Sequence, residues 1–199
     1  SKDEDIKAVR FLGDMGYVVT YQQRDPLFSI DFSDPEKLKV VDKIEMPGFS
    51  GYLHPVKDDL LLGIGEAEDG NAKISLYDIT DNHKLSIYDE KEIDHIKYNN
   101  VLEDYRKIFI DEENNIAGFG GTDYGDSDDE KEENREQNYY VLYHYDRDGK
   151  LQQIGEYPVK KEYRGFINQK FIGMRIGTWF YVIPEATSRQ DDMEIVPYS

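Results

Sequence analysis

The chain carries an internal repeat that restricts the folds open to it. Asp31–Leu38 (DFSDPEKL) aligns with Asp78–Leu85 (DITDNHKL), and a shorter third copy ends in Asp148–Leu151 (DGKL). In the two full copies, an apolar run leads into a turn with two aspartates, and a Lys-Leu pair opens the next apolar run. A single four-stranded sheet cannot bury both of its faces, whereas stacked sheets cover one another. A period of about 40–50 residues with several strands in each unit therefore indicates a β-propeller.

Short runs in which apolar and polar residues alternate fill most of the chain, and this is the pattern of half-buried strands. The 16 Tyr and 9 Phe in these runs argue against disorder. No stretch shows a sustained helical apolar stripe with caps, so we expect very little helix. The expected fold class is all-β, built from four-stranded antiparallel blades. The predicted strands span residues 16–21, 27–32, 38–44, 60–65, 73–79, 85–88, 106–110, 116–120, 139–145, 171–176 and 179–183.

Several segments also resemble the landmarks of one protein family. They are Val9–Asp14 (VRFLGD), Asp25–Pro35 (DPLFSIDFSDP), Pro47–Pro55 (PGFSGYLHP) and Leu61–Gly65 (LLGIG). On these segments the chain resembles the C-terminal portion of the secreted prokaryotic beta-propeller domain distantly related to WD-40 repeats, most strongly over residues 8–93. The resemblance implies an extracellular or cell-surface protein, with a signal or lipid anchor upstream and a ring larger than this chain. It implies no catalytic residues.

About four blades of this size fit into 199 residues. We expect one propeller domain over residues 1–199, with blades at about 6–48, 49–93, 94–160 and 161–199. The end blades of an incomplete ring have one uncovered apolar face, so such a chain either closes on itself or associates through those faces. Because the resemblance implies a larger ring, we expect the isolated chain to self-associate through its end blades.

The charge balance argues against several kinds of partner. With 42 acidic and 24 basic residues, the net charge is −18, which repels nucleic-acid phosphates and anionic lipid surfaces. The chain has no cysteine, so disulfides and thiolate metal sites are excluded. Its longest mainly apolar stretch, residues 171–183, contains Arg175 and is too short to span a bilayer.

The most acidic part of the chain is a loop that we predict at residues 123–138. Asp126, Asp128 and Glu130 place carboxylates at alternate positions, and calcium needs several such oxygen ligands. The loop lacks the glycine and the terminal glutamate of the EF-hand pattern. We therefore expect a solvated loop, because clustered like charges repel one another. The three residues are the calcium candidates of this chain, and no other metal and no cofactor are expected.

Other residues that are able to do chemistry form no recognised motif. Ser50, in GFSG, lacks the second glycine of a nucleophile elbow. The glycines at 118–121 are not followed by the lysine of a phosphate-binding loop. His54 has no second histidine at ligand spacing, and we expect it to be hydrogen-bonded at a blade turn. Arg164 and Arg175 are able to bind an anion in a channel, but pairing with neighbouring acids is the simpler expectation.

Four tyrosines of one predicted strand place aromatic rings on both of its faces, since neighbouring residues of a strand point in opposite directions. We expect them to fill the space between blades. A sugar-binding or peptide-binding platform is the alternative. These residues are Tyr139, Tyr140, Tyr143 and Tyr145.

These observations favour a non-enzymatic, extracytoplasmic β-propeller that acts as a binding module for a protein or polysaccharide partner. The alternative is a hydrolase or lyase with its site in the propeller channel, where side chains of several blades meet. A pocket in which histidine, arginine and carboxylates converge would favour the enzyme.

Overall fold

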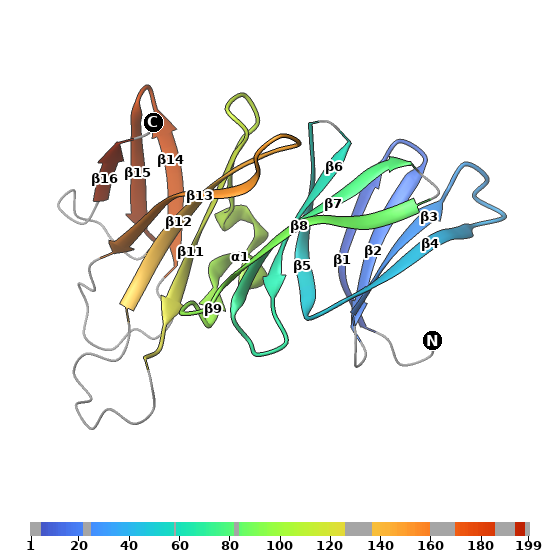
Figure 1. Cartoon of the computed structure of the whole chain (residues 1–199), viewed down its shortest axis with the longest axis horizontal. Helices are drawn as coiled ribbons and strands as arrows, with labels where there is room; N and C mark the ends of the chain where they lie inside the picture. Colours follow the sequence, from blue (N-terminus) through green and yellow to red (C-terminus); the bar gives the residue numbers. More distant parts are fainter. Residues whose placement is uncertain are drawn as a thin grey trace. The chain divides into compact units, whose positions relative to one another are not determined.

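The computed structural model describes residues 5–21, 25–57, 59–81, 84–125, 137–159, 170–185 and 194–197. These residues form four antiparallel sheets that follow one another along the sequence (Figure 1). The expected all-β fold built from four-stranded antiparallel blades is thereby confirmed.

The first two sheets have the same construction, and we call them blade 1 and blade 2. In each of them every strand pairs antiparallel with the next one in the sequence, so the sheet is a simple meander. Blade 1 contains β1 (Asp5–Leu12), β2 (Met15–Tyr21), β3 (Asp25–Asp31) and β4 (Lys39–Met46). Blade 2 contains β5 (Phe49–Val56), β6 (Leu60–Glu66), β7 (Ala72–Asp81) and β8 (Lys84–Ile93).

Blades 3 and 4 depart from this pattern. In blade 3 the two short strands β9 and β10 both pair with β11, at opposite ends of it, so together they take the place of one first strand. Blade 3 contains β9 (Tyr98–Asn99), β10 (Phe109–Asp111), β11 (Ile116–Asp123), β12 (Gln137–Asp146) and β13 (Lys150–Val159). Blade 4 contains β14 (Phe171–Ile176), β15 (Trp179–Pro184) and β16 (Glu194–Pro197).

A short helical segment separates β9 from β10. It consists of α1 (Asn100–Glu103) and a 3-10 helix (Tyr105–Lys107), so the prediction of a strand over residues 106–110 is wrong in its first half. The Asp104 carboxylate accepts a hydrogen bond from the backbone amide of Arg106 (3.1 Å) and two from its guanidinium. This cap stabilises a helical turn against the alternating pattern. Little helix was expected, and the described residues confirm this.

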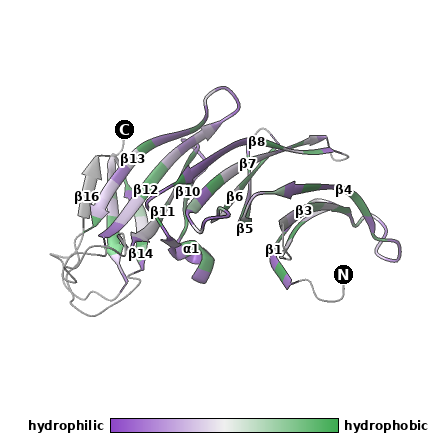
Figure 2. Cartoon of the chain, turned by 60° about the horizontal axis from the view of Figure 1, so that its bottom comes forward, coloured by the Kyte–Doolittle hydropathy of each residue, from purple (hydrophilic) through white to green (hydrophobic). Residues whose placement is uncertain are grey.

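The chain divides into two compact units. Unit 1 contains blades 1 and 2 together with residues 146–151, the tip of the β12–β13 hairpin, and unit 2 contains residues 94–145 and 152–199. Hydrophobic and hydrophilic residues are interspersed along the strands (Figure 2), so that one set is available to pack between sheets. The core between blades 1 and 2 contains Met15, Tyr17, Val19, Leu27, Met46, Leu53, Leu61, Tyr77, Ile79 and Leu85. The core of unit 2 contains Ile116, Tyr140, Leu142, Val159, Phe171, Phe180 and Val182.

The repeated turns occupy equivalent places in blades 1 and 2, as predicted. Each connects the third strand of its blade to the fourth. Asp31 Oδ1 accepts a hydrogen bond from the Ser33 backbone amide at 2.8 Å, and Asp78 Oδ1 accepts one from the Thr80 amide at 2.9 Å. An aspartate that bonds the amide two residues ahead stabilises a tight turn, which explains why both copies begin with this residue.

Within unit 1, an aspartate on the last strand of one blade accepts a hydrogen bond from the backbone at the start of the last strand of the following blade. Asp42 on β4 accepts the Leu85 backbone N–H at 2.7 Å, and Asp89 on β8 accepts the Leu151 backbone N–H at 3.0 Å. Each aspartate stands beside a β-bulge, which redirects a side chain away from the regular strand geometry. Leu85 and Leu151 are 5% and 4% exposed, whereas Leu38, the aligned residue of blade 1, is 56% exposed.

Large apolar side chains remain exposed on blades 1 and 4. In blade 1 they include Ile6 (65% exposed) and Phe11 (58%), and in blade 4 Ile176 (57%) and Trp179 (52%). Exposed apolar side chains of this size are available for contact with another surface. Self-association of the isolated chain through these blades stays a prediction.

Candidate functional site

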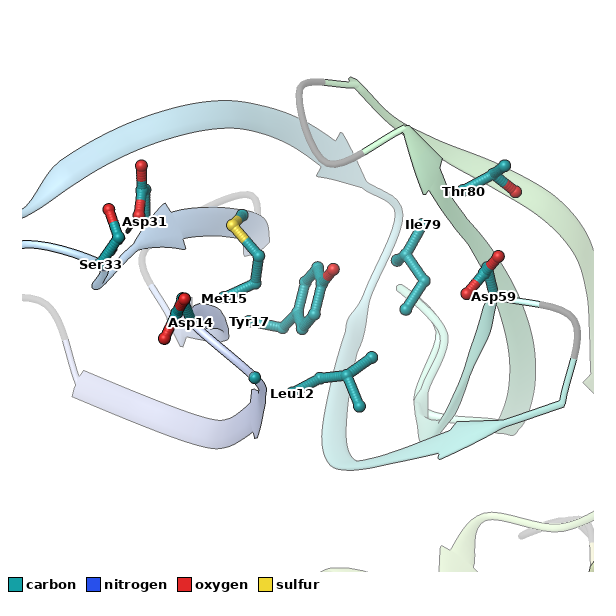
Figure 3. Close-up of a pocket in the computed structure, with 10 residues that line it drawn as sticks. Leu12, Asp14, Met15, Tyr17, Asp31, Ser33, Asp59, Ile79 and Thr80 are labelled. Carbon is teal, nitrogen blue, oxygen red and sulfur yellow. Dashed lines mark hydrogen bonds between the residues drawn. The ribbon is translucent and has the colours of Figure 1, made fainter.

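A pocket of about 560 Å³ opens in unit 1 between blades 1 and 2 (Figure 3). Asp14, Asp31 and Ser33 come from blade 1, while Asp59 and Thr80 come from blade 2. Figure 3 shows Tyr17 and Leu12 between these two groups. The lining consists of Leu12, Gly13, Asp14, Met15, Tyr17, Asp31, Ser33, Asp59, Ile79 and Thr80.

The polar residues of the pocket are placed by turns at the same end of each blade. Asp14 lies in the β1–β2 turn, and its carbonyl accepts the Phe32 backbone N–H at 2.8 Å. Asp59 lies in the β5–β6 turn, and its carbonyl accepts the Ile79 N–H at 2.9 Å. Asp59 has a φ of 53°, a left-handed conformation that aspartate and asparagine adopt more readily than most residues. In both turns the aspartate carbonyl accepts an amide of the same blade, and both aspartates line one opening.

The pocket is negatively charged over an apolar floor. Of the described residues that line it, three are aspartates and none is Lys, Arg or His. Burial of the Tyr17 side chain raises the pKa of its phenol, and the charge of Asp59 raises it further. Tyr17 therefore stays neutral, and its side chain is almost fully buried beneath the pocket. Carboxylates beside apolar surface suit a ligand that combines a positive charge with an aliphatic stem.

At the edge of the pocket, Asp78 and Thr80 of blade 2 bind the guanidinium group of Arg147, which belongs to the same unit. Arg147, at the tip of the β12–β13 hairpin, donates to Asp78 Oδ1 and Oδ2 at 3.1 and 3.0 Å. Arg147 also donates to Thr80 Oγ1 at 2.5 Å and to the Asp59 carbonyl at 3.5 Å. Its guanidinium lies 5.3 Å from the centre of the Tyr88 ring. The hydrogen bonds from Arg147 hold the pKa of the Asp78 carboxyl well below its usual range.

His54 lies in β5 and not at a blade turn, so that part of its prediction is wrong. Its imidazole is hydrogen-bonded, as expected: Nδ1 lies 3.1 Å from the Tyr52 hydroxyl and 3.4 Å from the Arg10 guanidinium. Arg10 comes from β1, so this contact joins the first strands of blades 1 and 2. Burial raises the pKa of the Tyr52 phenol, while the charge of Arg10 opposes that shift. The three groups hold each other in place.

The remaining candidates are structural. Ser50 is buried, and its hydroxyl lies 2.8 Å from the Tyr77 hydroxyl inside the core of unit 1. The glycines at 118–121 lie in the buried strand β11. Three of the four tyrosines of β12 are buried and fill space inside the fold, which is the packing role expected of them. These three are Tyr140, Tyr143 and Tyr145, and Tyr139 is half-buried.

Arg175 pairs with neighbouring acids, as the sequence suggested. Its Nε lies 3.2 Å from Asp111 and its Nη2 3.5 Å from Glu113. It also lines a second pocket of about 570 Å³ in unit 2, beside His144. Arg164 lies outside the described residues. The charge of Arg175 is already compensated by Asp111 and Glu113.

The calcium candidates Asp126, Asp128 and Glu130 also lie outside the described residues. Within the ranges that the structure describes, no group of three or more metal-ligating side chains converges. Nor does any helix in those ranges have the length and apolar character that crossing a bilayer requires.

The sequence did not single out three residues that the structure brings forward. Two are the pocket aspartates Asp14 and Asp59, and the third is Arg147, which binds Asp78. Arg147 directly precedes the third repeat copy at Asp148–Leu151, and this position is the one signal that marked it. Asp14 and Asp59 each end a short turn after a first strand, but the two turns differ too much in sequence to align without the structure.

Comparison with known proteins agrees with the fold. The chain is similar to uncharacterized proteins of Methanocaldococcus jannaschii (42% identity over 119 residues) and Archaeoglobus fulgidus (52% over 79 residues). The matches cover 58% and 40% of this chain, which spans only 18% and 13% of the length of those relatives. Among solved structures, Pyrococcus horikoshii acylaminoacyl peptidase has a TM-score of 0.53 at 15% identity, covering 98% of this chain and 31% of that one.

The likeness to the peptidase concerns the fold alone, because the sequence identity is low. The model of the Beta propeller domain family matches residues 1–176, which includes the repeats at Asp31 and Asp78 and both blades that form the acidic pocket. Together with the four-stranded antiparallel blades, this match shows that the chain belongs to the beta propeller domain family.

Proposed function

We propose that this β-propeller is an extracytoplasmic binding module, and that the pocket between blades 1 and 2 binds a basic side chain of a protein partner. The fold indicates an interaction module. The observation that carries the proposal is the convergence of Asp14, Asp31 and Asp59 on one pocket with an apolar floor.

The chemistry of the pocket favours a basic protein segment over a neutral polysaccharide. Lysine and arginine side chains carry a charge at the end of an aliphatic stem, so they match carboxylates above Leu12, Met15 and Ile79. Sugars are recognised mainly by hydrogen bonds and aromatic stacking, and Tyr17, the aromatic residue of this pocket, is only 1% exposed. The net charge of −18 also speeds the approach of a basic partner.

The alternative, a hydrolase or lyase, has less support. Its expected mark was the convergence of histidine, arginine and carboxylates in one pocket. Arg10 and His54 meet on the first strands of blades 1 and 2, outside the acidic pocket. His144 and Arg175 line the second pocket, but none of the described residues that line it is a carboxylate. The extracytoplasmic location is supported by the family resemblance and by the lack of cysteine, which suits secreted proteins that avoid unpaired thiols.

Fluorescence anisotropy with a labelled peptide that alternates basic residues with leucine tests the proposal. We expect saturable binding that weakens as salt is added, because the contact is between opposite charges. The double variant Asp14→Asn, Asp59→Asn should bind more weakly, and asparagine tolerates the backbone conformation of Asp59.

The matched control is Glu68→Gln with Asp148→Asn, which removes the same number of charges from exposed positions outside the pocket. Equal loss of binding in the two double variants would show that only the overall charge matters. Binding of a neutral glycan that is independent of salt and of the pocket aspartates would contradict the proposal.

A further inference from the structure

The second pocket, of about 570 Å³ in unit 2, has no part in the proposed function. It lies between blades 3 and 4: β11, β12 and β13 line it from blade 3, and β14 with the β14–β15 turn lines it from blade 4. Every described residue of its lining belongs to unit 2. Within the blades its position corresponds to that of the acidic pocket between blades 1 and 2.

Backbone hydrogen bonds establish this correspondence. In blade 1 the Phe32 N–H donates to the Asp14 carbonyl at 2.8 Å. In blade 3 the Tyr145 N–H donates to the Asn115 carbonyl at 2.9 Å. In both blades the residue before the donor and the residue after the acceptor line the pocket; they are Asp31 and Met15 in blade 1, and His144 and Ile116 in blade 3. The two pockets are therefore repeats of one groove.

The charge of the lining differs between the two pockets. His144 stands at the place of Asp31. Thr178, directly before β15, stands at the place of Asp59, directly before β6. Arg175 adds a positive charge, and none of the described residues that line the second pocket is a carboxylate. A basic side chain, which suits the three aspartates in unit 1, is therefore repelled by this pocket.

The buried Asp111 makes the second pocket unfavourable for an anion as well. Its side chain is 8% exposed and lies 3.2 Å from Arg175 Nε, while Glu113 lies 3.5 Å from Arg175 Nη2. The guanidinium is thus already held by two carboxylates, and a third carboxylate from a ligand would be repelled by them. The net charge of −18 acts in the same direction. The pocket therefore favours an uncharged group.

Asp111 also fixes the amide of Asn114. Asn114 Nδ2 donates to Asp111 Oδ2 at 2.8 Å, and the Asn114 backbone N–H donates to Asp111 Oδ1 at 3.2 Å. Because its nitrogen is bound to the carboxylate, the side chain offers its carbonyl oxygen to a ligand as an acceptor. The Thr178 hydroxyl and the Gln152 amide line the same pocket and are able to donate. Such a lining suits a group that both donates and accepts.

We propose that this pocket binds a primary amide, the side chain of a glutamine or asparagine of a protein partner. The NH2 group of that amide donates to the Asn114 carbonyl oxygen, and its own carbonyl oxygen accepts from Thr178. Ile116 and Ile154 contact the methylene groups of the bound side chain. None of the described lining residues is Phe, Tyr or Trp, so a sugar has no such ring to stack on.

The test uses the whole chain labelled with 15N and three small probes, the N-acetyl N-methylamides of glutamine, glutamate and lysine. Glutamine and glutamate have nearly the same shape and differ in charge. We expect the glutamine probe to shift the backbone amide signals of Ile116, Gly177 and Thr178 to saturation. It should bind about fivefold more tightly than the other two probes, because each of them loses at least one hydrogen bond.

Two substitutions of Thr178, an exposed residue of the β14–β15 turn, locate the site. Thr178→Val keeps the shape of the side chain and removes its hydroxyl, so the glutamine probe should bind about fivefold more weakly. Thr178→Asp reproduces Asp59 of the acidic pocket, so the lysine probe should bind about threefold more tightly. Ser86→Asp is the matched control: it adds the same charge at an exposed position outside both pockets and should change nothing.

Equal binding of the glutamine and glutamate probes would overturn the inference, as would an equal effect of Thr178→Asp and Ser86→Asp on the lysine probe. Glucose that shifts the same signals to saturation, while the glutamine probe shifts none, would show a sugar site and overturn it too. The basic peptide of the preceding section is followed in the same spectra at Met15 in unit 1. Binding of that peptide without a response to the glutamine probe removes this inference alone, and the converse removes the proposed function alone.

Discussion

Leu38 and Leu85 occupy the same position in two successive repeats, and we predict that truncating them has very different effects. Leu85 opens β8, is 5% exposed and belongs to the core between blades 1 and 2. Its backbone N–H is held by Asp42 at 2.7 Å. Leu38, just before β4, is 56% exposed. The substitutions are Leu85→Ala and Leu38→Ala.

Replacing leucine by alanine removes three carbon atoms from the side chain. At about 0.8 kcal/mol for each buried carbon, Leu85→Ala loses about 2.4 kcal/mol of transfer free energy, and the cavity left behind raises the total to about 3 kcal/mol. Leu38 is more than half exposed, and the effect of its truncation should stay near 0.5 kcal/mol. The hydrogen bond from residue 85 to Asp42 uses a backbone group and remains available in the alanine variant.

Urea denaturation followed by tyrosine and tryptophan fluorescence measures both values, provided that the slope with denaturant stays constant. The unmodified chain and the two variants are compared at one protein concentration, so that association does not change the result. Equal destabilisation by the two substitutions would refute the reasoning, because an exposed leucine would then contribute as much as a buried one.

Three further predictions follow from single contacts. Asp78→Asn should destabilise the chain by about 1–2 kcal/mol at pH 7, because it breaks the bidentate pair with Arg147, whose partners are both about 30% exposed. Arg147 lowers the pKa of Asp78 in the folded chain, so this contribution to stability is complete above the unfolded pKa of about 3.9 and is lost as the pH falls through the folded pKa. Urea midpoints of the parent and the variant at several pH values check this. A difference between the two midpoints that persists at the lowest pH counts against it. Tyr77→Phe should cost about 1–3 kcal/mol in the same assay, because the buried Ser50 hydroxyl loses its partner at 2.8 Å, and an unchanged midpoint would show that Ser50 finds another. Millimolar calcium should leave the thermal midpoint unchanged, since the sequence predicts a solvated loop at 123–138, and a clear rise would contradict this.

The repeat and its turns were predictable because their chemistry is local. An aspartate that bonds the amide two residues ahead stabilises the same turn wherever it occurs, so Asp31 and Asp78 could be aligned before the fold was known. The alternation of apolar residues likewise marks the strands. The strand expected at residues 106–110 failed for a local reason as well, since the Asp104 cap competes with the pattern.

The pocket was not predictable because its groups are brought together by packing between blades. Asp14 and Asp59 belong to turns of different length, and both look like ordinary surface acids in a chain with 42 of them. The bond from Arg147 to Asp78 joins residues that are 69 positions apart, and no periodicity marks it. The contact of Arg10 with His54 depends in the same way on how β1 packs against β5. The strands and turns were therefore predictable from the sequence, whereas the groups of the pocket are brought together only by contacts between blades.

The central claim is that a basic partner binds in the pocket between blades 1 and 2. Methyl NMR on a chain labelled at its four methionines tests this directly, because Met15 lines the pocket, whereas Met174 lies on β14 in unit 2 and is 42% exposed. On titration with the basic peptide, we expect the Met15 methyl signal to shift to saturation and the Met174 signal to stay in place. A shift of Met174 with no change at Met15 would contradict the claim.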